Sequence, residues 1–149
     1  VLDEARAAGV RLGLEPLHPM TVVERGCIST IAHALDLAQT LDPANAALGV
    51  VLDAYHVWWE PFLEAEVARC AGRIDAVHIC DWRTPTRDLL LDRGLPGDGV
   101  ANPRRLRALA EAAGYGGLIE IEVFQPDLWA LADADRIAVV ARDAALAHG

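Results

Sequence analysis

Four short apolar runs recur along the chain, at residues 10–17, 48–55, 74–82 and 117–124. Each run is too short for an ordinary α-helix and too continuously apolar for a strand with one face in water. Runs of this kind are typical of parallel strands that are buried on both faces. We therefore predict a β-strand at each of the four positions.

The segments between these runs carry apolar residues at helical spacing. In residues 29–41, Ser29 and Thr30 are candidate N-caps, and the apolar positions that follow share one helix face. A proline near the start and a glycine near the end bound two further helices, at residues 60–73 and 102–117. An amphipathic pattern predicts a last helix at residues 132–147, and another helix precedes the first strand.

A helix followed by four βα units defines an α/β fold with parallel βα repeats and right-handed crossovers. This pattern alone leaves open whether the sheet is doubly wound or closed into a barrel. No GxGxxG motif follows the first strand, which disfavours a dinucleotide-binding fold. The connection at residues 81–103 is long for a compact domain, and we expect it to be functional or disordered.

Charge and composition exclude several classes of partner. The net charge of -9 comes without a basic patch, which argues against binding to nucleic acid. No apolar run reaches the roughly 18 residues of a membrane span, and no signal-peptide pattern is present, so we expect no membrane partner and a cytoplasmic location. The three cysteines have neither disulfide nor zinc spacing, and we expect them to be reduced and mostly buried. The chain opens without methionine inside a predicted helix, which indicates a fragment of a longer protein.

Four polar residues interrupt the apolar runs near their C-terminal ends: Glu15, Asp53, His78 and Glu122. In a parallel sheet these ends share one edge, so the four side chains are expected to converge. Three carboxylates on an apolar floor repel one another unless a cation neutralises them. One acid at a strand end is most simply a helix cap, but four such residues in consecutive units favour a divalent metal site. Oxygen-rich ligands with one imidazole suit Mn²⁺, Mg²⁺ or Co²⁺, with Zn²⁺ as a further candidate.

Several neighbouring residues leave alternatives open. Glu120 shares a strand face with Glu122, and we choose Glu122 as the ligand because it is nearer the strand's C-terminal end. His56 is a second ligand, a donor to substrate or a solvated loop residue. His18 follows Glu15 at the same three-residue offset, and a surface role and a site role are both open for it. No function is assigned to His33 and His148.

The motifs "LEPLHP", "VVLDAYHVWWEP", "VHICDW", "DRGLPGDGV" and "AAGYGGLIEIEVFQPDLW" together resemble the sugar phosphate isomerase/epimerase family of the xylose isomerase-like TIM-barrel superfamily. The resemblance covers nearly the whole chain but corresponds only to the last four βα units of an eight-unit barrel. It implies that residues 1–149 are a single TIM-barrel domain whose N-terminal half is missing. It also implies that Glu15, Asp53, His78 and Glu122 hold the metal, and that His56 and Arg93 bind substrate hydroxyls. Asp81 stands where ketose epimerases have glutamate, which favours the inosose-processing or the uncharacterised branch of the family.

The resemblance implies a metal-dependent isomerase or epimerase that acts on a small-molecule sugar or cyclitol. Glu15 and Glu122 would remove and return a proton α to a carbonyl, through an enediolate that the metal stabilises. Trp58, Trp59 and Trp82 either line the sugar's carbon face or pack in the core. The alternatives are an inosose-type dehydratase, an apurinic-site endonuclease-like hydrolase, which the acidic charge disfavours, and an inactive half-barrel fragment. As partner we expect a second copy in a homo-oligomer or the missing N-terminal half-barrel.

Overall fold

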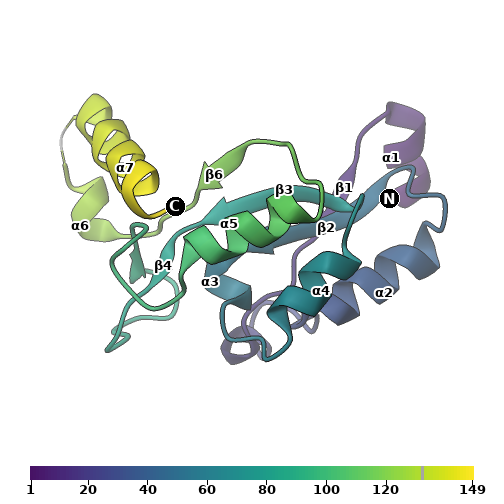
Figure 1. Cartoon of the computed structure of the whole chain (residues 1–149), viewed down its shortest axis with the longest axis horizontal. Helices are drawn as coiled ribbons and strands as arrows, with labels where there is room; N and C mark the ends of the chain where they lie inside the picture. Colours follow the sequence, from purple (N-terminus) through teal and green to yellow (C-terminus); the bar gives the residue numbers. More distant parts are fainter. Residues whose placement is uncertain (132) are drawn as a thin grey trace.

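The structure, a computed structural model, describes residues 1–131 and 133–149. Its helices are α1 (Leu2–Ala8), the 3-10 helix η1 (Pro19–Thr21), α2 (Ile31–Leu41), α3 (Ala54–Val57), α4 (Leu63–Arg69), α5 (Pro103–Ala112), α6 (Pro126–Trp129) and α7 (Ala134–His148). Its strands are β1 (Leu12–Leu14), β2 (Leu48–Asp53), β3 (Ile74–Ile79), β4 (Asp81–Trp82), β5 (Arg93–Gly94) and β6 (Ile119–Ile121). Figure 1 shows this order from the N-terminus to the C-terminus. The predicted α/β fold of parallel βα repeats is confirmed.

The central sheet has four strands in the order β1-β2-β3-β6, and every neighbouring pair is parallel. The register brings Asp53 of β2 opposite His78 of β3, and His78 opposite Glu120 of β6. Between Val50 and Val51 the β2–β3 pairing skips one residue, so that Asp75 bulges out of the ladder. Because strand side chains alternate, Asp53 and His78 share the sheet face that points away from the main helices.

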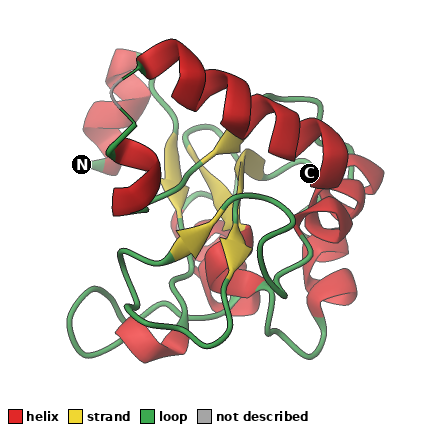
Figure 2. Ribbon diagram, turned by 90° about the vertical axis from the view of Figure 1, so that its left-hand side faces the viewer, coloured by secondary structure: helices red, strands yellow, loops and turns green. Residues whose placement is uncertain are grey.

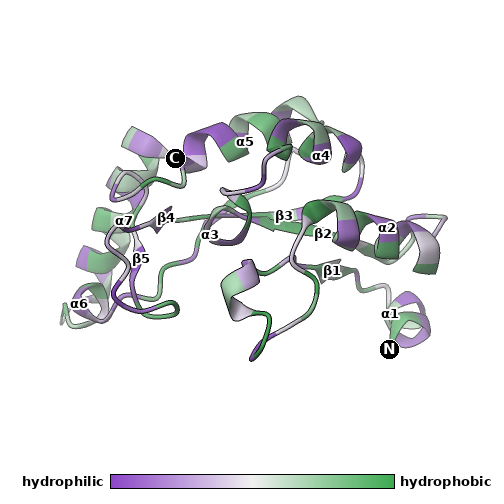
Figure 3. Ribbon diagram, turned by 90° about the horizontal axis from the view of Figure 1, so that it is seen from below, coloured by the Kyte–Doolittle hydropathy of each residue, from purple (hydrophilic) through white to green (hydrophobic). Residues whose placement is uncertain are grey.

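The main core lies between the sheet and the helices α2, α4 and α5. It contains the alternate residues Val50 and Leu52 of β2 together with Val77 and Ile79 of β3. Figure 2 shows the helices outside the strands, and Figure 3 shows α4 and α5 on one side of the sheet. The other sheet face is left free to carry polar side chains.

The strand boundaries are shorter than the apolar runs. The predicted strand at 10–17 is ordered as a strand only over Leu12–Leu14, and the one at 117–124 only over Ile119–Ile121. Both are edge strands, and neither contains a buried residue, so the expectation that all four strands are buried on both faces is wrong for these two. An edge strand has a neighbouring strand on one side only. It therefore forms ladder hydrogen bonds on that side alone and is shielded from solvent on that side alone.

The helix boundaries also differ from the sequence patterns. The predicted strand at 48–55 ends at Asp53, because the Asp53 carboxylate accepts a hydrogen bond from the Tyr55 amide and starts the short helix α3. The helix expected at 60–73 is confined to Leu63–Arg69, with Pro61 in the preceding turn. Thr30, not Ser29, caps α2, and Asn102 caps α5. The helix predicted at 132–147 corresponds to α7. Residue 132, the first residue of the predicted range, lies outside the described residues.

The long connection at residues 81–103 is ordered around a small antiparallel ribbon of β4 and β5. The buried Asp81 carboxylate accepts hydrogen bonds from the amides of Trp82, Gly97 and Ala101. Gly99 passes so close to the Trp82 carbonyl that a Cβ atom there would collide with it. Of the two expectations for this segment, functional or disordered, disorder is therefore wrong. The segment is ordered and borders the C-terminal edge of the sheet.

None of the helices in the described part of the chain combines the length and the apolar character that a membrane crossing requires. The cysteines are free: Cys70 and Cys80 are buried, and Cys27 is exposed.

Candidate metal centre

The strand ends bring together the four residues that sequence analysis selected. Glu15 follows the last residue of β1, Asp53 ends β2, His78 lies near the end of β3, and Glu122 follows β6. The Glu122 amide continues the β3 pairing by donating to the Ile79 carbonyl. One ligand atom from each of the four side chains lies within 4.8 Å of the other three. Sequence positions up to 107 apart thus meet at a single point of the sheet edge.

Within this group, the His78 imidazole lies between the two glutamates. Its Nδ1 is 3.6 Å from Glu15 Oε1 and 3.6 Å from Glu122 Oε2. These distances are too long for hydrogen bonds, and Nδ1 is buried without a hydrogen-bond partner in the described structure. Asp53 is fully buried, whereas the Glu15 and Glu122 side chains are 32% and 36% exposed. Of the four residues, the two glutamates are therefore the most open to a molecule that enters from outside, and His78 is 20% exposed.

The electrostatic field of the cluster favours positive charge. The carboxylates of Glu122 and Glu15 raise the pKa of His78 to about 10. Burial raises the pKa of the Asp53 carboxyl, and the nearby His78 lowers the pKa of Glu122. A site that pulls an extra proton onto an imidazole is also a site that a metal cation can occupy, with displacement of that proton.

The donor chemistry fits a divalent ion. Three carboxylates and one guanidinium, that of Arg93, leave two negative charges at the cluster, which one divalent cation balances. The His78 Nδ1, which has no hydrogen-bond partner in the described structure, would supply the nitrogen ligand. Three oxygens and one nitrogen suit a hard or borderline cation.

Arg93 and His56 are almost fully buried, and they lie deeper in the site than residues that contact a substrate from the solvent side. Arg93 Nη1 donates to Asp53 Oδ2 and to Glu122 Oε2, each at 2.8 Å. Burial lowers the pKa of His56 to about 4, so its ring is neutral at pH 7. The ring's Nδ1 accepts a hydrogen bond from the His18 amide, which puts the proton on Nε2, 3.2 Å from Arg93 Nη2. Two N–H donors therefore converge beside the carboxylates.

Other residues that the sequence raised lie around this centre in different roles. His18 is buried, and its ring stacks on Trp82 with ring centroids 4.6 Å apart. Trp82 is buried and packs on Tyr55 as well, so it is a packing residue in this structure. Asp81 is held by backbone amides rather than turned to the ligands. His33 lies on α2 and His148 ends α7.

Sequence reasoning missed Tyr55 and Phe124, whose rings flank the Arg93 guanidinium at 4.4 Å and 5.0 Å from their centroids. A signal for them exists: each aromatic residue stands two positions after an acidic residue at a strand end, Asp53 or Glu122. Cys80 was also missed as a neighbour of Asp53, with its Sγ 3.8 Å from Asp53 Oδ1.

The parallel βα units, with ligand-type residues collected at the C-terminal strand ends, define an α/β protein of the kind that includes TIM barrels and doubly wound sheets. The family model described as "Xylose isomerase-like TIM barrel" matches residues 1–143, and the chain belongs to this family. The chain is 26% identical over 137 residues to an inosose isomerase from Halalkalibacterium halodurans, covering 89% of this chain and 46% of the relative.

Two solved structures show the same arrangement of the chain. Protein SMc04130 from Sinorhizobium meliloti 1021 is 46% identical with a TM-score of 0.90, over 97% of this chain and 52% of that one. The IOLI protein with a bound zinc atom is 23% identical with a TM-score of 0.79, over 97% of this chain and 50% of that one, a likeness in fold. The chain spans about half the length of the relatives it matches.

Proposed function

We propose that this chain carries the metal-binding half of a sugar or cyclitol isomerase or epimerase. The observation that carries the proposal is the convergence of Glu15, Asp53, His78 and Glu122 within 4.8 Å at the C-terminal edge of the sheet. Family membership and the inosose isomerase relative support the reaction class. The IOLI structure, which is similar in fold, carries a bound zinc atom, and this supports a divalent metal as the cofactor.

The two glutamates are the proposed proton carriers. Glu15 and Glu122 are the partly exposed carboxylates of the cluster and stand on either side of His78. One of them takes a proton from the carbon next to a carbonyl, and the other returns it to the opposite face or to the adjacent atom. A divalent ion held by the four residues would stabilise the negative charge that develops on the substrate oxygens. Asp53, which is fully buried, is then a ligand only.

The proposed role of His56 and Arg93 is to hold a substrate oxygen. His56 Nε2 and Arg93 Nη2 are both donors and lie only 3.2 Å apart, so their protons repel one another unless an acceptor beside the pair takes a hydrogen bond from each. An oxygen that accepts from both relieves this conflict. A hydroxyl or carbonyl oxygen of a sugar or cyclitol supplies that acceptor.

The relative's name favours inosose as the first substrate to test, with isomerisation and dehydration distinguished by product. We further propose that residues 1–149 are an incomplete barrel domain, completed by an N-terminal half or by a second copy. The sheet ends at β1 on one side and at β6 on the other, which leaves both strands available for pairing.

A metal titration tests the site directly. With Mn²⁺, Mg²⁺, Co²⁺ or Zn²⁺ at about a hundredfold excess over the dissociation constant, we expect Tm to rise by about 5–10 °C, because about 2.7 kcal/mol of binding free energy is added to the folded state. Calorimetry of the full chain measures it.

The matched control for this titration uses two glutamates of the same cluster region. Glu15→Gln should abolish most of the shift, whereas Glu120→Gln, which changes an exposed carboxylate beside His78 that is not one of the four proposed ligands, should retain it. Equal shifts in both variants, or none in the wild type with any of the four ions, would exclude the proposed site.

A further inference from the structure

Five planar side chains form a continuous stack along the C-terminal edge of the sheet; we name it the planar stack. Its members, in order, are Phe124, Arg93, Tyr55, Trp82 and His18. The Arg93 guanidinium carbon lies 5.0 Å from the Phe124 centroid and 4.4 Å from the Tyr55 centroid. Tyr55 stacks on Trp82 at 4.5 Å, and Trp82 stacks on His18 at 4.6 Å. The stack joins segments that follow β1, β2, β3 and β6, so every βα unit contributes to it.

Both the interior and the end of the planar stack touch the candidate metal centre. Arg93, in the interior of the stack, donates hydrogen bonds to Asp53 and Glu122, two of the four proposed ligands of the candidate metal centre. At the far end, the backbone of His18 donates to His56 and fixes its tautomer. The orientation of the stack therefore sets the orientation of the groups that would face metal and substrate.

Aromatic contacts to Tyr55 and Phe124 add to the two Nη1 hydrogen bonds in fixing the plane of the guanidinium. Arg93 Nε is buried and has no hydrogen-bond partner in the described structure. The arginine is almost fully buried, so its charge depends on the two carboxylates and on the faces of the two rings. Without a ring on each side, the long side chain could rotate and its Nη1 would leave the midpoint between Asp53 and Glu122.

We propose that Phe124 and Tyr55 are positioning residues for the metal site: they clamp Arg93 in the plane that holds Asp53 and Glu122 in place as preassembled ligands. This inference rests on the proposed function. Contacts that orient metal ligands are worth about 10–100-fold in metal affinity. Phe124 is the member to test, because it is 38% exposed and its truncation leaves no buried cavity in the core.

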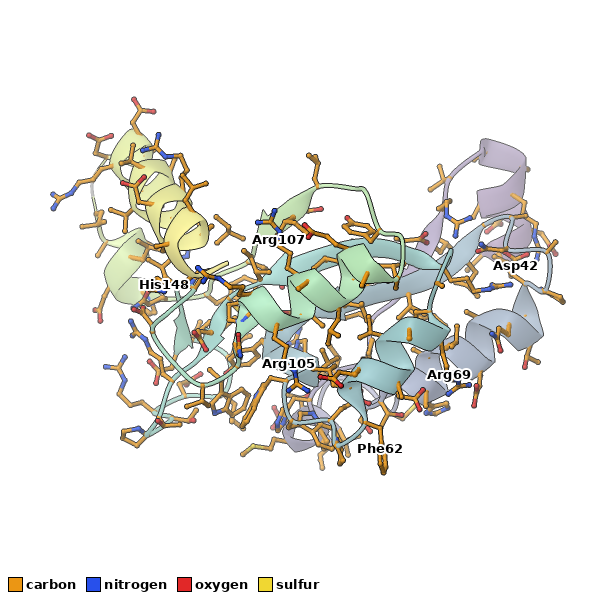
Figure 4. All side chains as sticks on the ribbon, in the orientation of Figure 1. Asp42, Phe62, Arg69, Arg105, Arg107 and His148 are labelled. Carbon is orange, nitrogen blue, oxygen red and sulfur yellow. The ribbon has the colours of Figure 1, made fainter. Side chains whose placement is uncertain are left out.

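The experiment is a Co²⁺ titration of the full chain, followed by visible absorption, which reports both affinity and ligand geometry. Phe124→Leu keeps apolar bulk but removes the ring, and we expect Co²⁺ affinity to fall about tenfold with a changed spectrum. Phe124→Tyr restores a ring and should bind within about twofold of the wild type. Phe62→Leu is the matched control, since Phe62 is 74% exposed beside α4 and points away from the sheet (Figure 4).

A double-mutant cycle separates positioning from general stability. Arg93→Lys keeps the charge but loses the plane, and should also weaken Co²⁺ binding about tenfold. If Phe124 acts through Arg93, adding Phe124→Leu to Arg93→Lys changes the affinity by less than about twofold, whereas independent effects multiply. Multiplying effects, or a Phe124→Leu variant with wild-type affinity and spectrum, would overturn the clamp while leaving the metal site intact. A wild-type chain that binds no Co²⁺ would overturn the proposed function and the clamp together.

Discussion

Asp53 shows how one residue of this chain serves fold and site together. Its Oδ1 accepts from the Tyr55 amide and so begins α3, which turns the chain away from the sheet. Its Oδ2 accepts from Arg93 inside the metal centre. Since the residue is fully buried, each oxygen must have a defined partner. The same side chain therefore ends the strand and contributes a proposed ligand at the point where the strand ends.

At the residue scale, the glutamate pair of β6 gives the sharpest prediction about activity. Glu122→Gln should lower turnover of a ketose or inosose by about 10²–10⁴, because the amide can neither take nor return a proton. Glu120→Gln, two residues earlier on the same strand face, should retain turnover. Product formation by both purified variants is the measurement, with circular dichroism to show that each is folded. Activity of Glu122→Gln close to that of the wild type would remove Glu122 from the mechanism.

Three of the residues that sequence analysis expected to converge, Glu15, Asp53 and Glu122, share one property: each marks the end of an apolar run, and the structure brings the three together. Strand ends can be read from the local pattern, and a parallel sheet gathers them at one edge. Tyr55 and Phe124 were missed because their importance comes from Arg93, which lies 38 and 31 residues away in sequence and whose position depends on the β4–β5 ribbon. No local period encodes that pairing.

At the element scale, the connection between α2 and β2 depends on Asp42. Its carboxylate accepts hydrogen bonds from the amides of Ala47 and Leu48 and pairs with Arg6 at 2.9 Å. These contacts lower the pKa of Asp42 from 3.8 to about 2. Figure 4 labels Asp42 at the end of the molecule that carries α1 and α2. The side chain thus joins α1, α2 and the start of β2.

Asp42→Asn should lower Tm at neutral pH, since the substitution removes the charge and one of the two accepting oxygens, of which Oδ2 accepts from the Ala47 and Leu48 amides and Oδ1 from Arg6. Because the folded-state pKa is depressed, the ionised carboxylate stabilises the fold above pH 3.8, and that contribution is lost as the pH falls from 3.8 through about 2. The Tm difference between wild type and variant should therefore shrink over this interval. Thermal melts from pH 2 to pH 7 measure it. A difference that does not change with pH would contradict the assignment.

Element boundaries were predicted less well than element order, and the reasons are physical. The run at 48–55 continues past the strand because Ala54 and Tyr55 are as buried as strand residues, although they begin α3. A buried helical residue and a buried strand residue are both apolar in sequence, so the apolar run does not show where the strand ends. The predicted strands at the two edges of the sheet are too long for a different reason. β1 and β6 each pair over three residues only, and the apolar residues beside those three have a neighbouring strand on one side only.

At the scale of the whole molecule, apolar surface is exposed where a complete barrel would have neighbours. The helix α7 contains no buried residue, and Val139, Val140 and Leu146 on it are exposed. Figure 1 shows α7 at one end of the molecule, beyond β6, and α1 at the other. Exposed apolar residues beside an unpaired strand edge favour association with another chain.

We therefore expect the chain on its own to associate as its concentration rises. Sedimentation velocity from low to high micromolar concentration should show a shift from monomer to dimer or larger species. Val139→Glu and Val140→Glu together should weaken the association if α7 takes part, and Ala144→Glu on the same helix is a control for added charge. A single monomeric species at every concentration would contradict this expectation.

The extra residue in the β2–β3 pairing decides which way an imidazole faces. Asp75 stands outside the ladder, held by Arg11 at 2.9 Å and lying over Gly49, where any Cβ would meet its carboxylate. Were Asp75 drawn into regular pairing, Asp53 would oppose Val77, and His78 would point into the helix layer instead of toward Glu15. Gly49, the smallest residue of β2, lies at the opposite end of the strand from the proposed ligand Asp53. By leaving room for Asp75, it sets which face of the sheet each later residue of β3 takes, and the candidate metal centre depends on this choice. A methyl group there would displace Asp75 and so disturb the register that points His78 toward the candidate metal centre, without contacting that centre.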